Sequence, residues 1–190
     1  MIMKQIPHYF IAIPLSASIK GLLSQWQVVL KQSLGYHQWV HPEDLHITLK
    51  FLGAIQDSKL LSVVDELSLV QNFNTFSLHI GSLGTFGHPH RPRVLWASVE
   101  RNSQLMGIQA QVEEQMLHVG FEKETRTFRP HVTLAKRWSG SPNKNNVDVM
   151  REQFREKSYL LPVEEVVLYQ IFPKQTPKYK VVSRYELRED

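Results

Sequence analysis

The sequence of 190 residues contains no cysteine. Without thiols the chain cannot form a disulfide, a thiolate zinc site or a cysteine nucleophile, so its chemistry must use His, Asp, Glu, Lys, Ser, Thr or Tyr. It also lacks long apolar runs: Phe10 to Leu15 is about six residues, whereas a membrane span needs ~18. Pro7, His8 and Pro14 leave too short an apolar stretch for a secretory leader. We therefore expect a cytoplasmic protein without a membrane segment.

The excess of positive charge is small. Lys and Arg number 22 against 18 Asp and Glu, a formal net charge of +4. This excess mildly favours an anionic partner and is far below the polybasic character of a dedicated nucleic-acid binder; a merely solvated surface is the alternative. The chain also has no Gly-rich phosphate loop of the Walker or Rossmann type, so an ATP-dependent ligase would lack its expected parts.

The spacing of apolar residues predicts an α+β fold. Strands are expected at 9–14, 45–52, 75–83, 93–99, 131–136, 163–172 and 178–187. Helices are expected at 16–34, 58–70, 103–119 and 147–157. Loops are expected at 84–92, where Gly, Pro and His separate two similar halves, at 140–146, and at 173–177. The strands follow one another too closely for crossovers throughout, which favours antiparallel pairing in one domain over residues 1–190.

One short pattern occurs twice. Residues 45–49 read Leu-His-Ile-Thr-Leu and residues 130–134 read Pro-His-Val-Thr-Leu, with the two histidines 85 residues apart. Each copy falls on a predicted strand, where alternate side chains share a face. His46 and Thr48 should therefore point together, as should His131 and Thr133, with Leu45, Ile47, Leu49 and Phe51 directed into a core. A single His-x-Thr arises readily by chance, since Thr is common in strands, but two such copies do so less easily.

Two histidines near two threonines suit acid–base chemistry on a phosphate. Imidazole has an unperturbed pKa near ~6.5, so one copy can accept a proton while another donates one at the same pH. Threonine hydroxyls can donate hydrogen bonds to phosphate oxygens without ionising. The pattern therefore favours metal-free cleavage of a phosphodiester.

Four segments together resemble a known family, the 2H phosphoesterases, and in particular the bacterial and archaeal RNA 2′,3′-cyclic phosphodiesterases, historically called 2′-5′ RNA ligases. The segments are Tyr-Phe-Ile-Ala-Ile-Pro at 9–14, Leu-His-Ile-Thr-Leu-Lys-Phe-Leu-Gly at 45–53, Val-Leu-Trp-Ala at 94–97 and Phe-Arg-Pro-His-Val-Thr-Leu-Ala-Lys at 128–136. The resemblance implies two pseudo-symmetric lobes around a central cleft, each supplying one His-x-Thr strand.

The same resemblance implies an activity and residue roles. The activity is hydrolysis of an RNA 2′,3′-cyclic phosphate to a 2′-phosphomonoester, without metal or other cofactor. His46 would be the proton donor and His131 the proton acceptor, while Thr48 and Thr133 would bind the phosphate. The substrate would be RNA with a cyclic phosphate end or a small cyclic nucleotide. We expect a monomer without an obligate protein partner.

A lysine follows each of the two motifs. The family often has Arg five residues after the second histidine, where this chain has Lys136, which keeps the charge but loses the bidentate fork. Strict alternation places Lys136 on the face opposite His131, so it reaches a phosphate only if the strand ends or bulges first. Lys50 shares the face of His46 and is expected to point to solvent or, alternatively, to contact a phosphate.

The segment His88-Pro89-His90-Arg91-Pro92-Arg93 could suggest a metal site, but no Asp, Glu or Cys lies nearby in the sequence. A solvated connection is expected, with contact to an RNA backbone as the alternative. Arg126 and Arg129, just before the second motif, could add positive potential to the cleft; the alternative for Arg129 is that it holds the loop in place. Candidate aromatic residues for stacking RNA bases are Tyr36, Trp39, Phe86, Phe128, Trp138 and Tyr169.

Three other functions remain open from the sequence. The chain could be a catalytically silent module that binds RNA ends, although both motifs retain His and Thr. It could be a metallohydrolase, in which case chelation would abolish activity. RNA 2′-5′ ligation or cleavage could also occur as a side activity, with ligation running as the reverse of phosphodiester cleavage.

Overall fold

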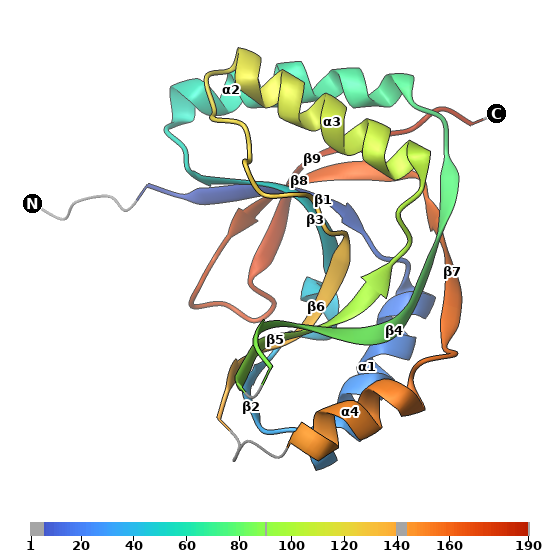
Figure 1. Cartoon of the computed structure of the whole chain (residues 1–190). Helices are drawn as coiled ribbons and strands as arrows, with labels where there is room; N and C mark the ends of the chain where they lie inside the picture. The colour runs from blue at the N-terminus through green and yellow to red at the C-terminus, as the bar shows by residue number, and fades with distance from the viewer. Residues whose placement is uncertain (1–5, 90, 140–143, 190) are drawn as a thin grey trace, which may run out of the picture.

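A computed structural model describes residues 6–89, 91–139 and 144–189, with the side chains of 144–146 left out. The strands of this part form one antiparallel sheet in the order β7-β4-β5-β6-β3-β1-β8-β9, with β2 beside β6 (Figure 1). Their bounds are β1 His8–Pro14, β2 Tyr36–Trp39, β3 His46–Ala54, β4 Phe76–His88, β5 Arg91–Val99, β6 His131–Trp138, β7 Ser158–Val163, β8 Glu165–Ile171 and β9 Tyr179–Glu186. The expected antiparallel α+β class is confirmed.

In the part of the chain that the structure describes, four α-helices cover the sheet: α1 Ala17–Ser33, α2 Asp57–Leu67, α3 Ser103–His118 and α4 Lys144–Gln153. Short 3-10 helices follow β2 at Pro42–Asp44 and α2 at Ser68–Asn72. In α1 the Ser16 side chain caps the first turn by accepting the N–H of Ile19, and buried Ile19, Leu23 and Leu30 recur at helical spacing. None of the described helices is both long and apolar enough to cross a lipid bilayer.

The strand order is symmetric about the contact between β3 and β6. Moving outward, β1 corresponds to β5, β8 to β4, and β9 to β7. The helices do not stay beside the strands that precede them. The Gln27 amide of α1 donates to the Leu134 carbonyl of β6 at 2.9 Å, and Glu113 of α3 pairs with Lys50 of β3. The two similar halves of the sequence therefore interleave, and each half of the sheet uses strands and helices from both.

The predicted loop at 84–92 is wrong, because β4 continues to His88 and forms a hairpin with β5. Its glycines permit close approach: a Cβ at Gly84 would lie 2.0 Å from the Trp96 ring. Gly87 has φ +110° at a bulge in the hairpin. The Gly and Pro residues that suggested a loop thus shape a hairpin, of which His90 lies outside the described residues.

Two short strands, β2 and β7, were also missed. Tyr36–Trp39 is only four residues long, and Ser158–Val163 includes a proline, so neither shows clear alternation. The other expected strands and helices are present, and the hairpin loop at 173–177 is confirmed between β8 and β9. Of the expected polar loop at 140–146, residues 140–143 lie outside the described residues and α4 begins at Lys144.

Candidate active site

The two His-x-Thr segments meet at the centre of the sheet. Strands β3 and β6 are antiparallel, and Ile47 lies opposite Val132. Continuing this register by one residue on each side places His46 opposite Thr133 and Thr48 opposite His131. All four lie on the face of the sheet opposite to Ile47 and Val132. Both Ile47 and Val132 are fully buried, while the four polar residues are half-buried. The structure therefore brings all four predicted residues together on one face.

Both strands contain a bulge directly after the motif. In β3, Leu49 has no partner between the pairs Ala12–Thr48 and Ile11–Lys50. In β6, Leu134 has none between Trp96–Thr133 and Leu95–Ala135. A bulge adds one residue and reverses the alternation beyond it. The fifth residue after each histidine consequently returns to the histidine face.

These fifth residues are Phe51 and Lys136. Phe51 is 60% exposed rather than directed into the core, so the expectation for it is wrong. Lys136 lies on the face of His131, because β6 bulges at Leu134, before Lys136, as the sequence pattern required for this placement.

Each imidazole is oriented by the backbone two residues before it. The Nδ1 of His46 lies 2.7 Å from the Asp44 carbonyl oxygen, and the Nδ1 of His131 lies 2.7 Å from the Arg129 carbonyl oxygen. A carbonyl oxygen only accepts hydrogen bonds, so Nδ1 carries the hydrogen in both rings. Nε2 is then the nitrogen available for proton transfer. At His46 it accepts the Thr48 hydroxyl at 2.9 Å.

The environment favours neutral imidazoles. Loss of hydration, with the positive charge of Lys136 and the proximity of His131, lowers the pKa of His46 to about 4 despite the hydrogen bond to Asp44. The pKa of His131 is lowered by the same loss of hydration and by Lys136. Burial and the nearby Lys178 also lower the pKa of Lys136. An anionic ligand between these groups would relieve this repulsion.

Aromatic rings surround both histidines. Phe10 and Tyr179 have ring centroids 4.6 and 5.3 Å from that of His46. Phe86 and Trp96 lie 4.8 and 6.0 Å from His131. Phe10 and Trp96 were not predicted as site residues, because each sits in a strand pattern that also describes a core.

The six aromatic candidates from the sequence divide into two groups. Phe86 and Tyr169 lie beside the histidines, with Tyr169 6.3 Å from His46. Tyr36 is instead buried in the core, and three others are partly buried against it: Trp39, Phe128 and Trp138.

Asp44 is the residue that sequence reasoning missed most clearly. Its side chain is buried, and its carboxylate accepts the backbone N–H groups of Lys178, at 3.0 and 2.9 Å, and of Tyr179, at 3.1 Å. Its carbonyl orients His46. Asp44 therefore joins the start of β9 to the first motif, which brings Tyr179 to His46.

Lys50 neither points to solvent nor reaches the site. The Lys50 side chain is buried, and its Nζ donates to the Glu113 carboxylate at 2.7 Å and to the Glu122 carbonyl at 2.9 Å. Of the two arginines before the second motif, Arg126 pairs with Glu124 at the surface, whereas Arg129 contributes its carbonyl to His131.

The model of the LigT-like phosphoesterases matches residues 13–96 and 98–179. The chain belongs to this family. A relative in Bacillus subtilis strain 168 is 31% identical and aligns over 95% of this chain and 97% of its own. One in Geobacillus stearothermophilus is 35% identical over 95% of this chain, which spans only 57% of that protein. Both are named RNA 2′,3′-cyclic phosphodiesterase.

Solved structures support the LigT-like fold. A protein of Thermus thermophilus superposes with a TM-score of 0.79 at 22% identity and covers 96% of this chain and 99% of its own. Escherichia coli LigT, complexed with 3′-AMP, has a TM-score of 0.75 at 23% identity and covers 96% of this chain and 98% of its own. At these identities the likeness establishes the fold.

In this LigT-like phosphoesterase, Lys136→Met should raise the pKa of both His46 and His131. The substitution removes a positive charge that disfavours both imidazolium ions. NMR titration of the imidazole signals measures the two values directly. Lys157→Met, at an exposed site between α4 and β7, is the matched control and should leave both values unchanged. Unchanged or lower values in Lys136→Met would contradict the prediction.

Proposed function

We propose that this phosphoesterase hydrolyses 2′,3′-cyclic phosphate at RNA 3′ ends, or in small cyclic nucleotides, to a 2′-phosphomonoester. The names of its relatives in Geobacillus and Bacillus support the substrate class. The observation that carries the mechanism is the shared orientation of the two imidazoles: both Nδ1 atoms are held by backbone carbonyls, which leaves both Nε2 atoms for proton transfer.

In the proposed reaction, His131 Nε2 accepts a proton from water as the water oxygen bonds to phosphorus. The bond from phosphorus to the ribose 3′ oxygen breaks, and protonated His46 donates its Nε2 proton to that oxygen. The phosphate stays on the 2′ oxygen, and the two histidines return to their starting states by proton exchange with solvent. This assignment of donor and acceptor follows the family resemblance.

Neighbouring groups support these roles. In the free protein the Thr48 hydroxyl donates to His46 Nε2. Once that nitrogen is protonated, Thr48 can donate instead to a phosphate oxygen, as Thr133 on the same face can, and Lys136 adds a positive charge there. The free protein disfavours the protonated form of His46 that the reaction needs. A bound phosphodiester anion opposes that effect, because a nearby negative charge raises the pKa of an imidazole. Substrate binding would thus help create the acid.

The chain supplies both histidines itself, from β3 and β6, which supports a monomer that acts as one catalytic unit over residues 1–190. Because the proposed substrate is RNA, we place the proposed activity in the cytoplasm.

The test is incubation of the wild-type protein, in EDTA, with a short RNA that ends in 2′,3′-cyclic phosphate. The expected product ends in 2′-phosphate, and its rate should show a bell-shaped pH profile, since one histidine must be neutral and the other protonated. A 3′-phosphate product would contradict the assigned leaving group. Loss of activity on chelation would indicate a metallohydrolase, and binding without turnover would indicate a silent recognition module.

A further inference from the structure

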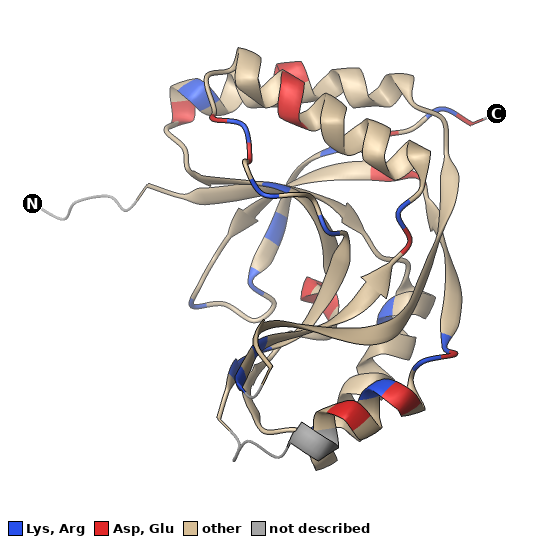
Figure 2. Ribbon diagram, viewed as in Figure 1, with Lys and Arg blue, Asp and Glu red and all other residues tan. Residues whose placement is uncertain are grey.

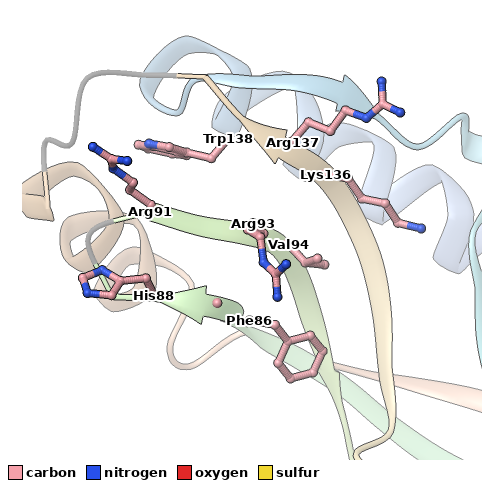
Figure 3. A pocket seen from close by; sticks show the side chains of 9 residues that line it. Phe86, His88, Arg91, Arg93, Val94, Lys136, Arg137 and Trp138 are labelled. Atoms are coloured by element: carbon pink, nitrogen blue, oxygen red, sulfur yellow. The ribbon is translucent and has the colours of Figure 1, made fainter.

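A basic pocket of about 810 Å³ opens beside the site, between the tip of the β4–β5 hairpin and the end of β6 (Figure 3). A space of this size suits a ligand as large as a nucleotide. Its charged lining consists of Arg91, Arg93, Lys136 and Arg137, and its apolar lining includes Phe86.

Among the described residues, the lining of this pocket contains no carboxylate to balance its charge. The lining residues fall within 86–94 and 136–138, and the longer stretches of sequence around them, 67–99 and 125–147, contain no Asp or Glu. Figure 2 likewise shows no acidic segment at the tip of the hairpin. Within the described ranges, Arg91, Arg93 and Arg137 make no ion pair. The pocket therefore attracts anions and has no internal counter-charge to displace.

The backbone directs two of these arginines. Arg93 is the extra residue of a bulge, since Phe86 pairs with Val94 and Gly87 pairs with Pro92. Arg137 has φ +60°, the left-handed region that non-glycine residues rarely adopt. Bulges and strained residues are concentrated beside functional sites, where they redirect side chains. In Figure 3 the Arg93 guanidinium points toward Phe86.

Two residues of the pocket lining, Phe86 and Lys136, also adjoin the histidines. Phe86 lies 4.8 Å from His131, and Lys136 depresses the pKa values of both histidines. Along β5, Ser98 lies opposite His131, and Arg93 follows five residues farther out. At a rise of about 3.3 Å per residue, the backbone of Arg93 lies roughly 15 Å from the backbone of Ser98, which is opposite His131. The long arginine side chain shortens the gap to the histidine.

We propose that this pocket binds the RNA strand on the 5′ side of the cyclic end, with Arg91 and Arg93 on its phosphodiesters. The inference rests on the proposed function and extends it to the substrate's length. In a cyclic phosphate the terminal 2′ and 3′ oxygens are both esterified, so the strand continues only through the 5′ oxygen. The next phosphates are then the anions closest to the site. The enzyme should thus prefer oligoribonucleotides to cyclic mononucleotides.

The test compares kcat/KM for a cyclic mononucleotide with that for a tetraribonucleotide ending in the same cyclic nucleotide. Wild type should favour the tetraribonucleotide. Arg91→Ala/Arg93→Ala should lower the ratio of the two values by roughly tenfold or more, since hydrogen bonds between charged groups are lost. For the tetraribonucleotide, the plot of log kcat/KM against log salt concentration should become less steep, by about 0.7 in slope for each phosphate contact that is lost. The control, Arg101→Ala/Arg155→Ala, removes the same charge from exposed sites outside the pocket.

A second measurement does not need turnover. Fluorescence anisotropy with a labelled tetraribonucleotide ending in 2′-phosphate should show a Kd roughly tenfold weaker in the pocket variant and near wild type in the control. If wild type cleaves neither substrate but only the pocket variant loses binding, the proposed function fails and the pocket stands. If both double variants behave alike, or if wild type treats both substrates equally, the pocket proposal is overturned.

Discussion

His46→Ala and His131→Ala are each expected to lower kcat/KM for an RNA 2′,3′-cyclic phosphate by at least ~10²-fold, the scale of one general acid–base step. Both side chains are half-buried on the site face, and each is oriented by a hydrogen bond to a backbone carbonyl, so the fold should tolerate their removal. Rates measured in EDTA with circular dichroism as a folding control check this. A variant that retains the wild-type rate would remove its histidine from the mechanism.

A second substrate separates the proton donor from the acceptor. In a 3′-deoxynucleoside 2′-(p-nitrophenyl phosphate), nitrophenolate replaces the ribose 3′ oxygen and leaves without a proton. A variant lacking the acid should recover much of its relative rate on this substrate, whereas one lacking the base should not. We expect recovery in His46→Ala and none in His131→Ala. The reverse result would exchange the two roles and leave the two-histidine mechanism intact.

The duplicated motif was enough to predict that the four His and Thr side chains of the candidate site share one face, because a period of two on a strand assigns His and Thr to the same side. It could not predict which residues beyond the motif join the face of the histidines. Leu49 and Leu134 are apolar residues in an apolar pattern, and nothing local shows that each is the extra residue of a bulge. The bulges arise from pairing with β1 and β5, so the positions of Phe51 and Lys136 depended on tertiary structure.

Asp44 illustrates a second limit. Its carboxylate binds the backbone of residues 178 and 179, which are 134 and 135 positions away, and such a contact leaves no local sequence signal. The hairpin at 84–92 illustrates a third. Gly and Pro usually mark loops, but Gly84 is needed because the Trp96 ring lies where a side chain would project.

Glu113→Gln is expected to reduce the free energy of unfolding by about 3–5 kcal/mol, because it leaves the Lys50 ammonium buried without its counter-charge. Both side chains of this pair are only 6% exposed, and their N–O distance is 2.7 Å. Urea denaturation followed by circular dichroism measures the change. Arg126→Gln breaks the solvent-exposed pair with Glu124 and should reduce the free energy of unfolding far less than Glu113→Gln does.

The double variant Lys50→Met/Glu113→Gln tests the cause of that loss. It removes both charges while keeping an amide oxygen that can accept the Glu124 N–H, as the Glu113 carboxylate does at 3.1 Å. Replacing both members of a buried pair is often nearly neutral, so stability should return toward wild type. If the double variant is as unstable as Glu113→Gln, the loss comes from packing or hydrogen bonding rather than charge. Recovery would instead show that Glu113→Gln is unstable because Lys50, in the motif strand β3, keeps a buried charge that Glu113 of α3 neutralises in the wild type.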